Sequence, residues 1–160
     1  MRIHLATDHS GFAIKESIVS HLQEQGYEIV DHGAFTLQHD DDYVDFVRLA
    51  AQAVSNNPQD KAIILGGSGQ GEAIVANRFP HVRAAVYYGK AGTQTDSDGN
   101  NLDMIASTRR HNDANVLSLG VRFLDEQHIH EVIERWLDTP FEGAERHLRR
   151  INKIDQQEKN

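Results

Sequence analysis

The sequence of 160 residues predicts an α/β fold, a parallel sheet with helices on both faces. Segments with strand and helix patterns alternate along the chain, which is typical of parallel strands joined by right-handed crossovers. The continuous apolar run Ala62-Ile63-Ile64-Leu65 is typical of a strand buried on both faces. A glycine-rich segment follows this run directly, beyond the carboxyl end of the strand, where ligands bind in such folds.

Hydrophobic spacing and chain breakers place the individual elements. Apolar patterns predict strands over residues 3–7, 27–30, 62–65, 83–88 and 116–119. Apolar residues at helical spacing predict helices over residues 14–22, 44–54 and 129–136, which end before Gly26, Pro58 and Pro140. A short helix through Ala76, another beginning near Leu102 and a C-terminal helix over residues 144–157 complete the pattern. We therefore expect three layers, with the sheet between two layers of helices.

The length is that of one domain, so residues 1–160 are expected to share one core. Residues 89–101 are rich in Gly, Thr, Asp, Ser and Asn and show no periodicity, which predicts an exposed loop insertion. The tail over residues 156–160 is expected to fray.

Composition argues against several classes of function. Sixteen Lys and Arg against twenty-four Asp and Glu give a net charge of −8, which argues against a nucleic-acid partner. There is no cysteine, so disulfides, a thiolate nucleophile and thiolate metal sites are excluded. No apolar run has the length of a membrane span and no secretory leader is visible, so we expect a cytoplasmic protein with no membrane partner.

The strongest candidate site is the segment Gly66-Gly67-Ser68-Gly69-Gln70-Gly71-Glu72. Glycines after a buried strand allow backbone N–H groups to converge on an anion at a helix N-terminus. The segment lacks the Gly-Lys-Ser/Thr ending of a P-loop, and it follows the third strand, whereas a dinucleotide-binding motif follows the first. A tight turn without a ligand is the alternative. Glu72 is either a general base or a carboxylate that matches the helix dipole, and the residues alone leave both readings open.

A second candidate is Asp8-His9-Ser10-Gly11, after the first strand. Asp8 or Ser10 could cap the following helix, but the position at the mouth of the sheet favours a functional carboxylate and imidazole. The histidines interpreted as structural or exposed are His4, His21, His32, His39, His81, His128 and His130. No His-Glu-x-x-His spacing is present, so a metal site has no support.

The segment Glu145-Arg146-His147-Leu148-Arg149-Arg150 is locally basic in an acidic protein. Arg146 and Arg150 lie four residues apart on one helix face, so both could hold one phosphate, although a solvated basic face is equally compatible. Because this helix is terminal, a site that uses it could be completed by packing onto a second subunit.

Taken together, these segments resemble the ribose-5-phosphate isomerase B family, which includes galactose-6-phosphate and allose-6-phosphate isomerases. The matching segments occur in family order over nearly the whole chain. They are Asp8-His9-Ser10-Gly11, Asp42-Tyr43, Gly66 to Glu72, Ala76-Asn77, His111-Asn112-Asp113-Ala114-Asn115-Val116-Leu117, Gly120-Val121-Arg122 and Arg146-His147-Leu148-Arg149-Arg150. Many members begin the glycine loop with a cysteine that acts as the base. This sequence has Gly66 there and resembles a cysteine-less branch that uses a glutamate after the loop, which makes Glu72 the expected base.

The resemblance implies a five-stranded Rossmann-like sheet and a homodimer, sometimes paired into tetramers, with active sites shared between subunits. It implies a sugar phosphate as the partner, no metal or organic cofactor, and a place in the pentose phosphate pathway. The implied reaction is aldose–ketose isomerisation, most simply of ribose 5-phosphate to ribulose 5-phosphate, through an enediolate. In this reading Glu72 moves the proton between C2 and C1, and Asp8 and His111 open the sugar ring, with their division of labour open.

The other implied roles concern binding. Ser68 and the N–H groups of Gly67, Gly69 and Gly71 would stabilise the enediolate oxygen. The side chains implied to hold the phosphate are His9, Arg122, Arg146, His147 and Arg150, and those implied to contact the sugar are Tyr43 and Asn112.

Two alternatives to this function remain. One is another aldose phosphate, namely allose 6-phosphate, galactose 6-phosphate or a tetrose phosphate, accommodated by the long 89–101 loop. The other is a non-catalytic phosphosugar-binding module on the same fold.

Overall fold

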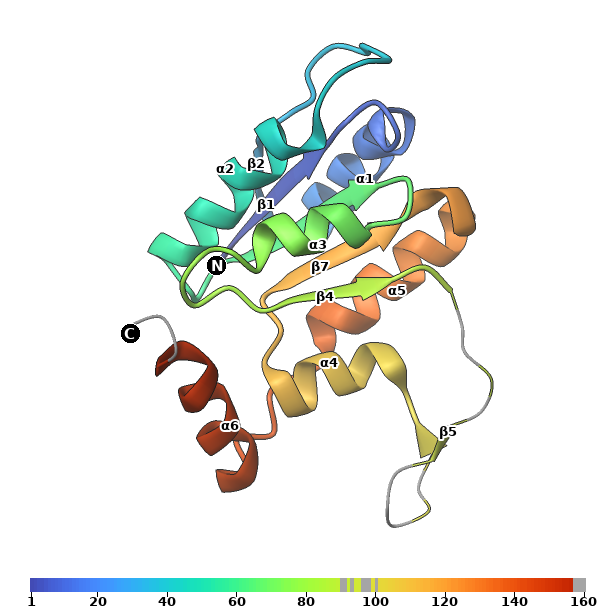
Figure 1. Cartoon of the computed structure of the whole chain (residues 1–160). Helices are drawn as coiled ribbons and strands as arrows, with labels where there is room; N and C mark the ends of the chain where they lie inside the picture. The colour runs from blue at the N-terminus through green and yellow to red at the C-terminus, as the bar shows by residue number, and fades with distance from the viewer. Residues whose placement is uncertain (90–91, 93, 96–98, 100, 157–160) are drawn as a thin grey trace.

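Five parallel strands form the centre of the molecule, in the order β2-β1-β3-β7-β4 (Figure 1). They are β1 (Arg2–Thr7), β2 (Glu28–Asp31), β3 (Lys61–Gly66), β4 (Ala84–Tyr87) and β7 (Val116–Gly120). This computed structural model describes residues 1–89, 92, 94–95, 99 and 101–156. The predicted α/β fold with a five-stranded parallel sheet is confirmed.

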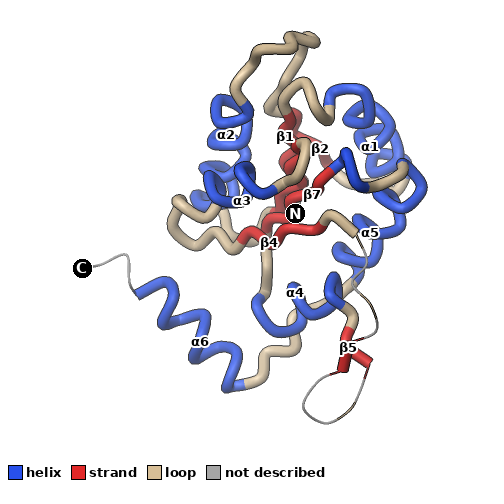
Figure 2. Tube along the Cα trace, turned by 45° about the vertical axis from the view of Figure 1, so that its right-hand side comes forward, coloured by secondary structure: helices blue, strands red, loops and turns tan. Residues whose placement is uncertain are grey.

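Helices cover both faces of the sheet, as the alternating pattern predicted. On one face lie α2 (Tyr43–Asn56) and α3 (Gln70–Ala76), and on the other lie α1 (Phe12–Glu24) and α5 (Glu126–Asp138) (Figures 1 and 2). The 3₁₀ turn η1 (Val121–Phe123) follows β7. Two further helices, α4 (Met104–Asn112) and α6 (Glu145–Gln156), lie at the edge of the molecule, and α6 projects farthest from the sheet.

Strand β3 shows why this sequence folds as a buried strand. Successive side chains of a strand point to opposite faces, so its apolar run divides between two cores. Ile63 and Leu65 join the cluster under α1 and α5, whereas Ala62 and Ile64 join the cluster under α2 and α3. All four are fully buried. The run therefore contributes side chains to the cores on both faces of the sheet. The glycine-rich segment that follows Leu65 lies at the carboxyl edge of the sheet.

The segment predicted as an irregular loop over residues 89–101 contains a short pair of strands. In this pair β5 (Gln94–Thr95) runs antiparallel to β6 (Asn101–Leu102). These four residues are exposed, but their pairing as strands was not predicted, because two-residue strands are too short to produce a periodic pattern. The helix predicted to begin near Leu102 is α4, which begins at Met104 after Asp103, whose Oδ1 accepts the Ala106 N–H at 2.9 Å and caps the helix. Residues 90, 91, 93, 96–98, 100 and 157–160 lie outside the described residues.

No helix in the described ranges is both long and apolar enough to cross a membrane.

A buried carboxylate stabilises the amino edge of the sheet. Asp60, 2% exposed, accepts hydrogen bonds from the Arg2 backbone N–H at 2.8 Å and from Asn57 Nδ2 at 2.8 Å. Burial raises its pKa, but these bonds, together with those from the His4 and Arg2 side chains, outweigh burial and lower the pKa from 3.8 to about 2. The ionised carboxylate therefore stabilises the fold above pH 3.8, and this contribution is lost as the pH falls toward 2.

Asp60→Asn is expected to lower the free energy of unfolding at pH 7 by about 2 kcal/mol, the equivalent of this pKa difference. Denaturant unfolding at pH 7 and pH 2 measures the effect, with the exposed Asp40→Asn as the matched control. The difference between the wild type and Asp60→Asn should shrink at pH 2. An equal difference at both pH values would show that the charge is not responsible.

Candidate active site

The glycine loop is fixed in place by neighbouring strands. Gly69 has a left-handed φ of 74°, and a Cβ there would lie 3.0 Å from Ser118 Oγ and from the Leu119 backbone, so no side chain fits without displacing β7. Ser118 Oγ donates a hydrogen bond to the Gly69 carbonyl at 2.6 Å. The Arg122 N–H donates to the Gly67 carbonyl at 3.3 Å. Two loop carbonyls are thus bound to β7 and η1, which limits the movement of the loop.

Glu72 points from the first turn of α3 back over the start of the loop. Its side chain is buried, with the residue 5% exposed. A Cβ added at Gly66 would lie 1.8 Å from Glu72 Oε1 and 2.1 Å from its Cδ, which is far inside any allowed contact. The carboxylate therefore occupies the space that a side chain at position 66 would fill. Glycine at 66 and the buried position of Glu72 depend on each other.

The environment of Glu72 shifts its titration toward neutral pH. Burial raises its pKa above the ordinary value of 4.5, its own backbone N–H lowers it, and the negative charge of Asp8 raises it further. A carboxylate with a raised pKa binds a proton more readily near neutral pH, as a general base requires. This environment favours the reading of Glu72 as a base over a mere match to the helix dipole.

A hollow of about 500 Å³ lies in front of Glu72. The sequence-predicted residues that line it are Asp8, His9, Tyr43, Gly67, Ser68, Gly71, Glu72 and Arg122. Ser10, which belongs to the second candidate segment but was given only a possible capping role, and Phe123, which the sequence did not single out, also line it. A Cβ at Gly71 would lie 2.6 Å from Tyr43 Oη, and one at Gly67 would lie 3.2 Å from the Arg122 guanidinium carbon. Glycines thus allow the phenol and the guanidinium to approach the loop, whereas Gly69, predicted beside them, faces β7.

Asp8 and His9 lie beside the loop because β1 and β3 are neighbours with the same direction. Asp8 is buried, and its Oδ1 accepts the Ser10 N–H at 2.9 Å. The first turn of α1 has no side-chain cap, so a helix-capping role for Asp8 or Ser10 is not found. His9 Nδ1 lies 2.7 Å from Asp41 Oδ1, a partner that the sequence had not indicated.

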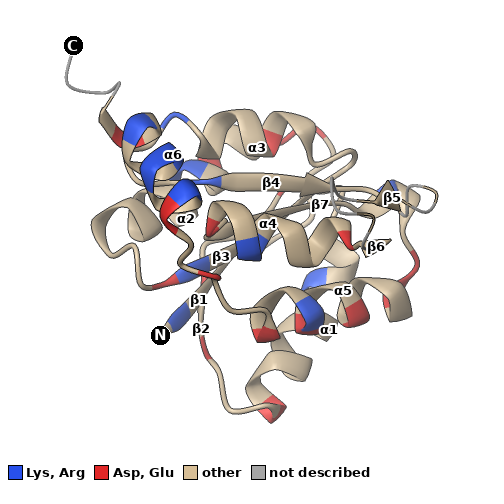
Figure 3. Cartoon of the chain, turned by 90° about the horizontal axis from the view of Figure 1, so that it is seen from below, with Lys and Arg blue, Asp and Glu red and all other residues tan. Residues whose placement is uncertain are grey.

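The remaining predicted site residues lie elsewhere in the chain. They are His111, Asn112, Arg146, His147 and Arg150, and none of them lines the hollow. His111 and Asn112 end α4, a few residues before β7 begins, so they lie toward the amino ends of the strands, opposite the glycine loop (Figure 1). The three C-terminal residues belong to α6, where basic positions gather (Figure 3). Within one chain the predicted residues therefore form two groups. The first lies around the glycine loop, and the second lies at the end of α4 and on α6.

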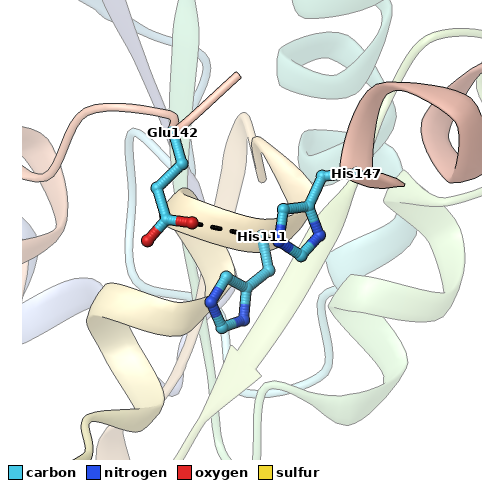
Figure 4. A group of neighbouring side chains, drawn as sticks. All are labelled: His111, Glu142 and His147. Atoms are coloured by element: carbon cyan, nitrogen blue, oxygen red, sulfur yellow. Dashed lines mark ion pairs between the residues drawn. The ribbon is translucent and has the colours of Figure 1, made fainter. Parts of the chain in front are cut away.

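Side chains of the second group contact one another and the neighbouring Glu142. The rings of His111 and His147 stack, with centroids 4.7 Å apart and planes 10° from parallel, and Glu142 Oε2 lies 3.9 Å from His147 Nε2 (Figure 4). Burial lowers the pKa of His147, and the charges of His111 and Arg146 lower it further. Arg146 Nε donates to His147 Nε2 at 3.2 Å, which agrees with a neutral imidazole. These contacts hold His111 against α6.

Among the residues that the structure describes, two sets of side chains have the composition of metal ligands. In one, His111, Glu142 and His147 bring their ligand atoms within 4.8 Å of one another, and in the other, Asp8, His9 and Asp41 do so. Stacked imidazoles direct their in-plane lone pairs side by side, so the first set would need ring rotation to converge on an ion. In the second set the His9–Asp41 hydrogen bond already accounts for the close approach.

A separate hollow of about 540 Å³ lies between β4, α4 and α5. Its charged side chains are paired with one another, Asp103 with Arg135 and His128 with Glu131. It contains no part of the glycine loop and none of the buried carboxylates described above. The hollow in front of Glu72 is thus the better candidate for chemistry.

Comparison with known proteins identifies the family. The sequence profile of the Ribose/Galactose Isomerase family matches residues 3–154. The chain belongs to the Ribose/Galactose Isomerase family. It is 34% identical to ribose-5-phosphate isomerase B of Mycolicibacterium paratuberculosis over 159 residues, which cover 99% of this chain and 92% of that protein.

Solved structures of this family share the fold. The crystal structure of ribose-5-phosphate isomerase B from Mycoplasma genitalium with bound ribulose-5-phosphate matches with a TM-score of 0.87 and 34% identity, covering 99% of this chain and 97% of that one. The Clostridium thermocellum enzyme matches with a TM-score of 0.84 and 36% identity, covering 99% and 98%. These comparisons confirm the predicted family, fold class and reaction class, an isomerase that interconverts aldoses and ketoses.

Proposed function

We propose that this chain interconverts ribose 5-phosphate and ribulose 5-phosphate, with Glu72 as the base that moves a proton between C2 and C1. The observation that carries the proposal is the buried Glu72 carboxylate, placed over Gly66 at the wall of a hollow large enough for a sugar phosphate. Membership in the Ribose/Galactose Isomerase family supports the substrate class, because its relatives are ribose-5-phosphate isomerases B. The cytoplasmic location stays a prediction.

The chemistry follows from the groups that line the hollow. The ionised Glu72 would remove the C2 proton of the open-chain aldose and return it to C1, and the hydroxyl proton on O2 would pass to O1. Ser68 and the loop N–H groups would stabilise the negative enediolate oxygen between the two transfers. Asp8 shares the hollow and is a candidate for ring opening. His9 and Arg122 are the positively charged candidates for the phosphate within the same chain, and Tyr43 would contact the sugar.

The site needs residues from a second copy of the chain. His111, Asn112, Arg146, His147 and Arg150 lie away from the hollow of their own chain, toward the opposite edge of the sheet. A two-fold homodimer could bring this group of one copy to the glycine loop of the other, since each contact then occurs twice. His111 would then act with Asp8 in ring opening, Arg146, His147 and Arg150 would close on the phosphate, and Asn112 would contact the sugar.

A panel of aldose phosphates tests the substrate. The purified protein should convert ribose 5-phosphate with a higher kcat/KM than allose 6-phosphate, galactose 6-phosphate or a tetrose phosphate. A higher value for another sugar would move the proposal to that sugar. Tight binding of a sugar phosphate without turnover would contradict an enzymatic role.

The raised pKa of Glu72 predicts the acid limb of the pH profile. The base must be ionised, so kcat should fall as the pH drops through the Glu72 pKa, with a midpoint above 4.5. Because Asp8 contributes to the rise, Asp8→Asn should move this midpoint to lower pH in addition to lowering kcat. Turnover measured between pH 4 and pH 8 gives this midpoint. A midpoint at or below 4.5 in the wild type would contradict the assignment of Glu72 as the base.

A further inference from the structure

We propose that Asp41 is a positioning residue, which holds the His9 imidazole in place for the substrate phosphate. The inference rests on the proposed function, where His9 is assigned to that phosphate. Asp41 itself does not line the hollow. It lies in the loop between β2 and α2 and acts on the site through His9.

One carboxylate oxygen of Asp41 accepts two hydrogen bonds from the same residue. Its Oδ1 lies 2.7 Å from His9 Nδ1 and 3.1 Å from the His9 backbone nitrogen. The side chain of Asp41 is 8% exposed and that of His9 is 26% exposed, so the pair is shielded on the Asp41 side and open on the side of the hollow. With Nδ1 engaged in this way, the other ring nitrogen, Nε2, is the one that can donate to a ligand in the hollow.

The charges around His9 favour the imidazolium. The hydrogen bond with Asp41 raises the pKa of His9 above 6.5, partial burial acts against it, Asp8 adds to the rise and Arg122 opposes it. Asp8 Oδ2 lies 3.7 Å from His9 Nδ1, and the His39 ring stands edge-on at 6.4 Å. A cationic donor binds a phosphate dianion more strongly than a neutral imidazole does, by a charge-assisted hydrogen bond.

The second oxygen of Asp41 indicates that the carboxylate is placed for this contact. Asp41 Oδ2 is buried, with no hydrogen-bond partner among the described residues. A buried carboxylate oxygen without a partner is unfavourable, so the position is maintained by what Oδ1 holds. The neighbouring Asp40 and Asp42 are exposed. Only the middle one of three consecutive aspartates reaches His9, which explains why the sequence could not distinguish it.

The test is Asp41→Asn, with Asp40→Asn as the matched control. Replacing the carboxylate removes the negative charge but keeps the size of the side chain. We expect KM for ribose 5-phosphate to rise about tenfold, the effect of weakening one charge-assisted hydrogen bond, while kcat changes less than twofold. KM should rise with pH as His9 loses its proton. This rise should begin at a lower pH in Asp41→Asn than in the wild type. His9→Asn should raise KM as well, and adding Asp41→Asn to it should have little further effect.

A measurement without substrate separates this inference from the proposed function. The His9 ring resonance, assigned by its absence in His9→Asn, is titrated by NMR in the wild type and in Asp41→Asn. The wild type should titrate above 6.5, and Asp41→Asn should titrate lower. If ribose 5-phosphate proves not to be a substrate, this titration still tests the effect of Asp41 on His9. An unchanged titration, an unchanged KM, or a fall in kcat without a change in KM would each overturn the inference. If Asp41→Asn does not fold, Asp41→Ser is measured in its place, with the same expected shifts.

Discussion

Glu72→Gln is expected to lower kcat for ribose 5-phosphate by a factor on the order of 10² to 10⁴, the usual contribution of a general base, while KM changes little. The amide keeps the size of the side chain but cannot accept the C2 proton. Because the buried carboxylate has a raised pKa, its ionised form destabilises the fold above pH 4.5. Glu72→Gln should therefore unfold at the same or a higher temperature than the wild type at pH 7, so a loss of turnover cannot be ascribed to misfolding.

The matched control for this variant is Glu16→Gln, an exposed glutamate on α1. It should keep the wild-type kcat and KM. The measurement is steady-state kinetics for both variants, with substrate binding to Glu72→Gln checked by calorimetry. Turnover of Glu72→Gln within a few-fold of the wild type would contradict the assignment of the base.

Gly66→Ala is expected to lower kcat by about 10²-fold, the effect of displacing a catalytic group by about an ångström. The added methyl would overlap the Glu72 carboxylate, which would have to move. Because this carboxylate ends a flexible side chain, we expect the side chain rather than the backbone to shift, and the free energy of unfolding to change by less than about 1 kcal/mol.

Combining the two changes isolates the mechanism. Gly66→Ala should have little further effect on kcat in a Glu72→Gln background, because the group that it displaces is already inactive. Gly92→Ala is the control, since a Cβ there meets nothing within 4 Å. Wild-type turnover by Gly66→Ala, or full additivity of the two losses, would show that position 66 does not act through Glu72.

The fold was predictable wherever burial imposed a pattern. The run from Ala62 to Leu65 predicts a central strand because each face of the sheet has its own apolar core. The strands β5 and β6 were missed because two exposed residues each leave no such pattern.

The candidate site was predictable where it follows strands. Parallel strands bring their carboxyl ends to one edge, so Asp8, the glycine loop and Arg122 were expected together and lie together. The contact of Asp41 with His9 could not be predicted, because the path of the loop from β2 to α2 decides which of three aspartates reaches His9. The place of His111 at the amino edge follows from its position at a helix end just before a strand, but its stacking against His147 of α6 required the structure.

A mixed dimer that carries a change in each group of residues, one in each chain, tests directly whether the active site is shared between two copies. Glu72→Gln and His111→Asn chains are co-expressed with different tags, and the mixed dimer is purified through both. If each site uses Glu72 of one copy and His111 of the other, each homodimer has two damaged sites and the mixed dimer has one intact site. We expect nearly inactive homodimers and a mixed dimer with about half of the wild-type kcat. A mixed dimer as inactive as the two homodimers, or the absence of any mixed assembly, would contradict a shared active site.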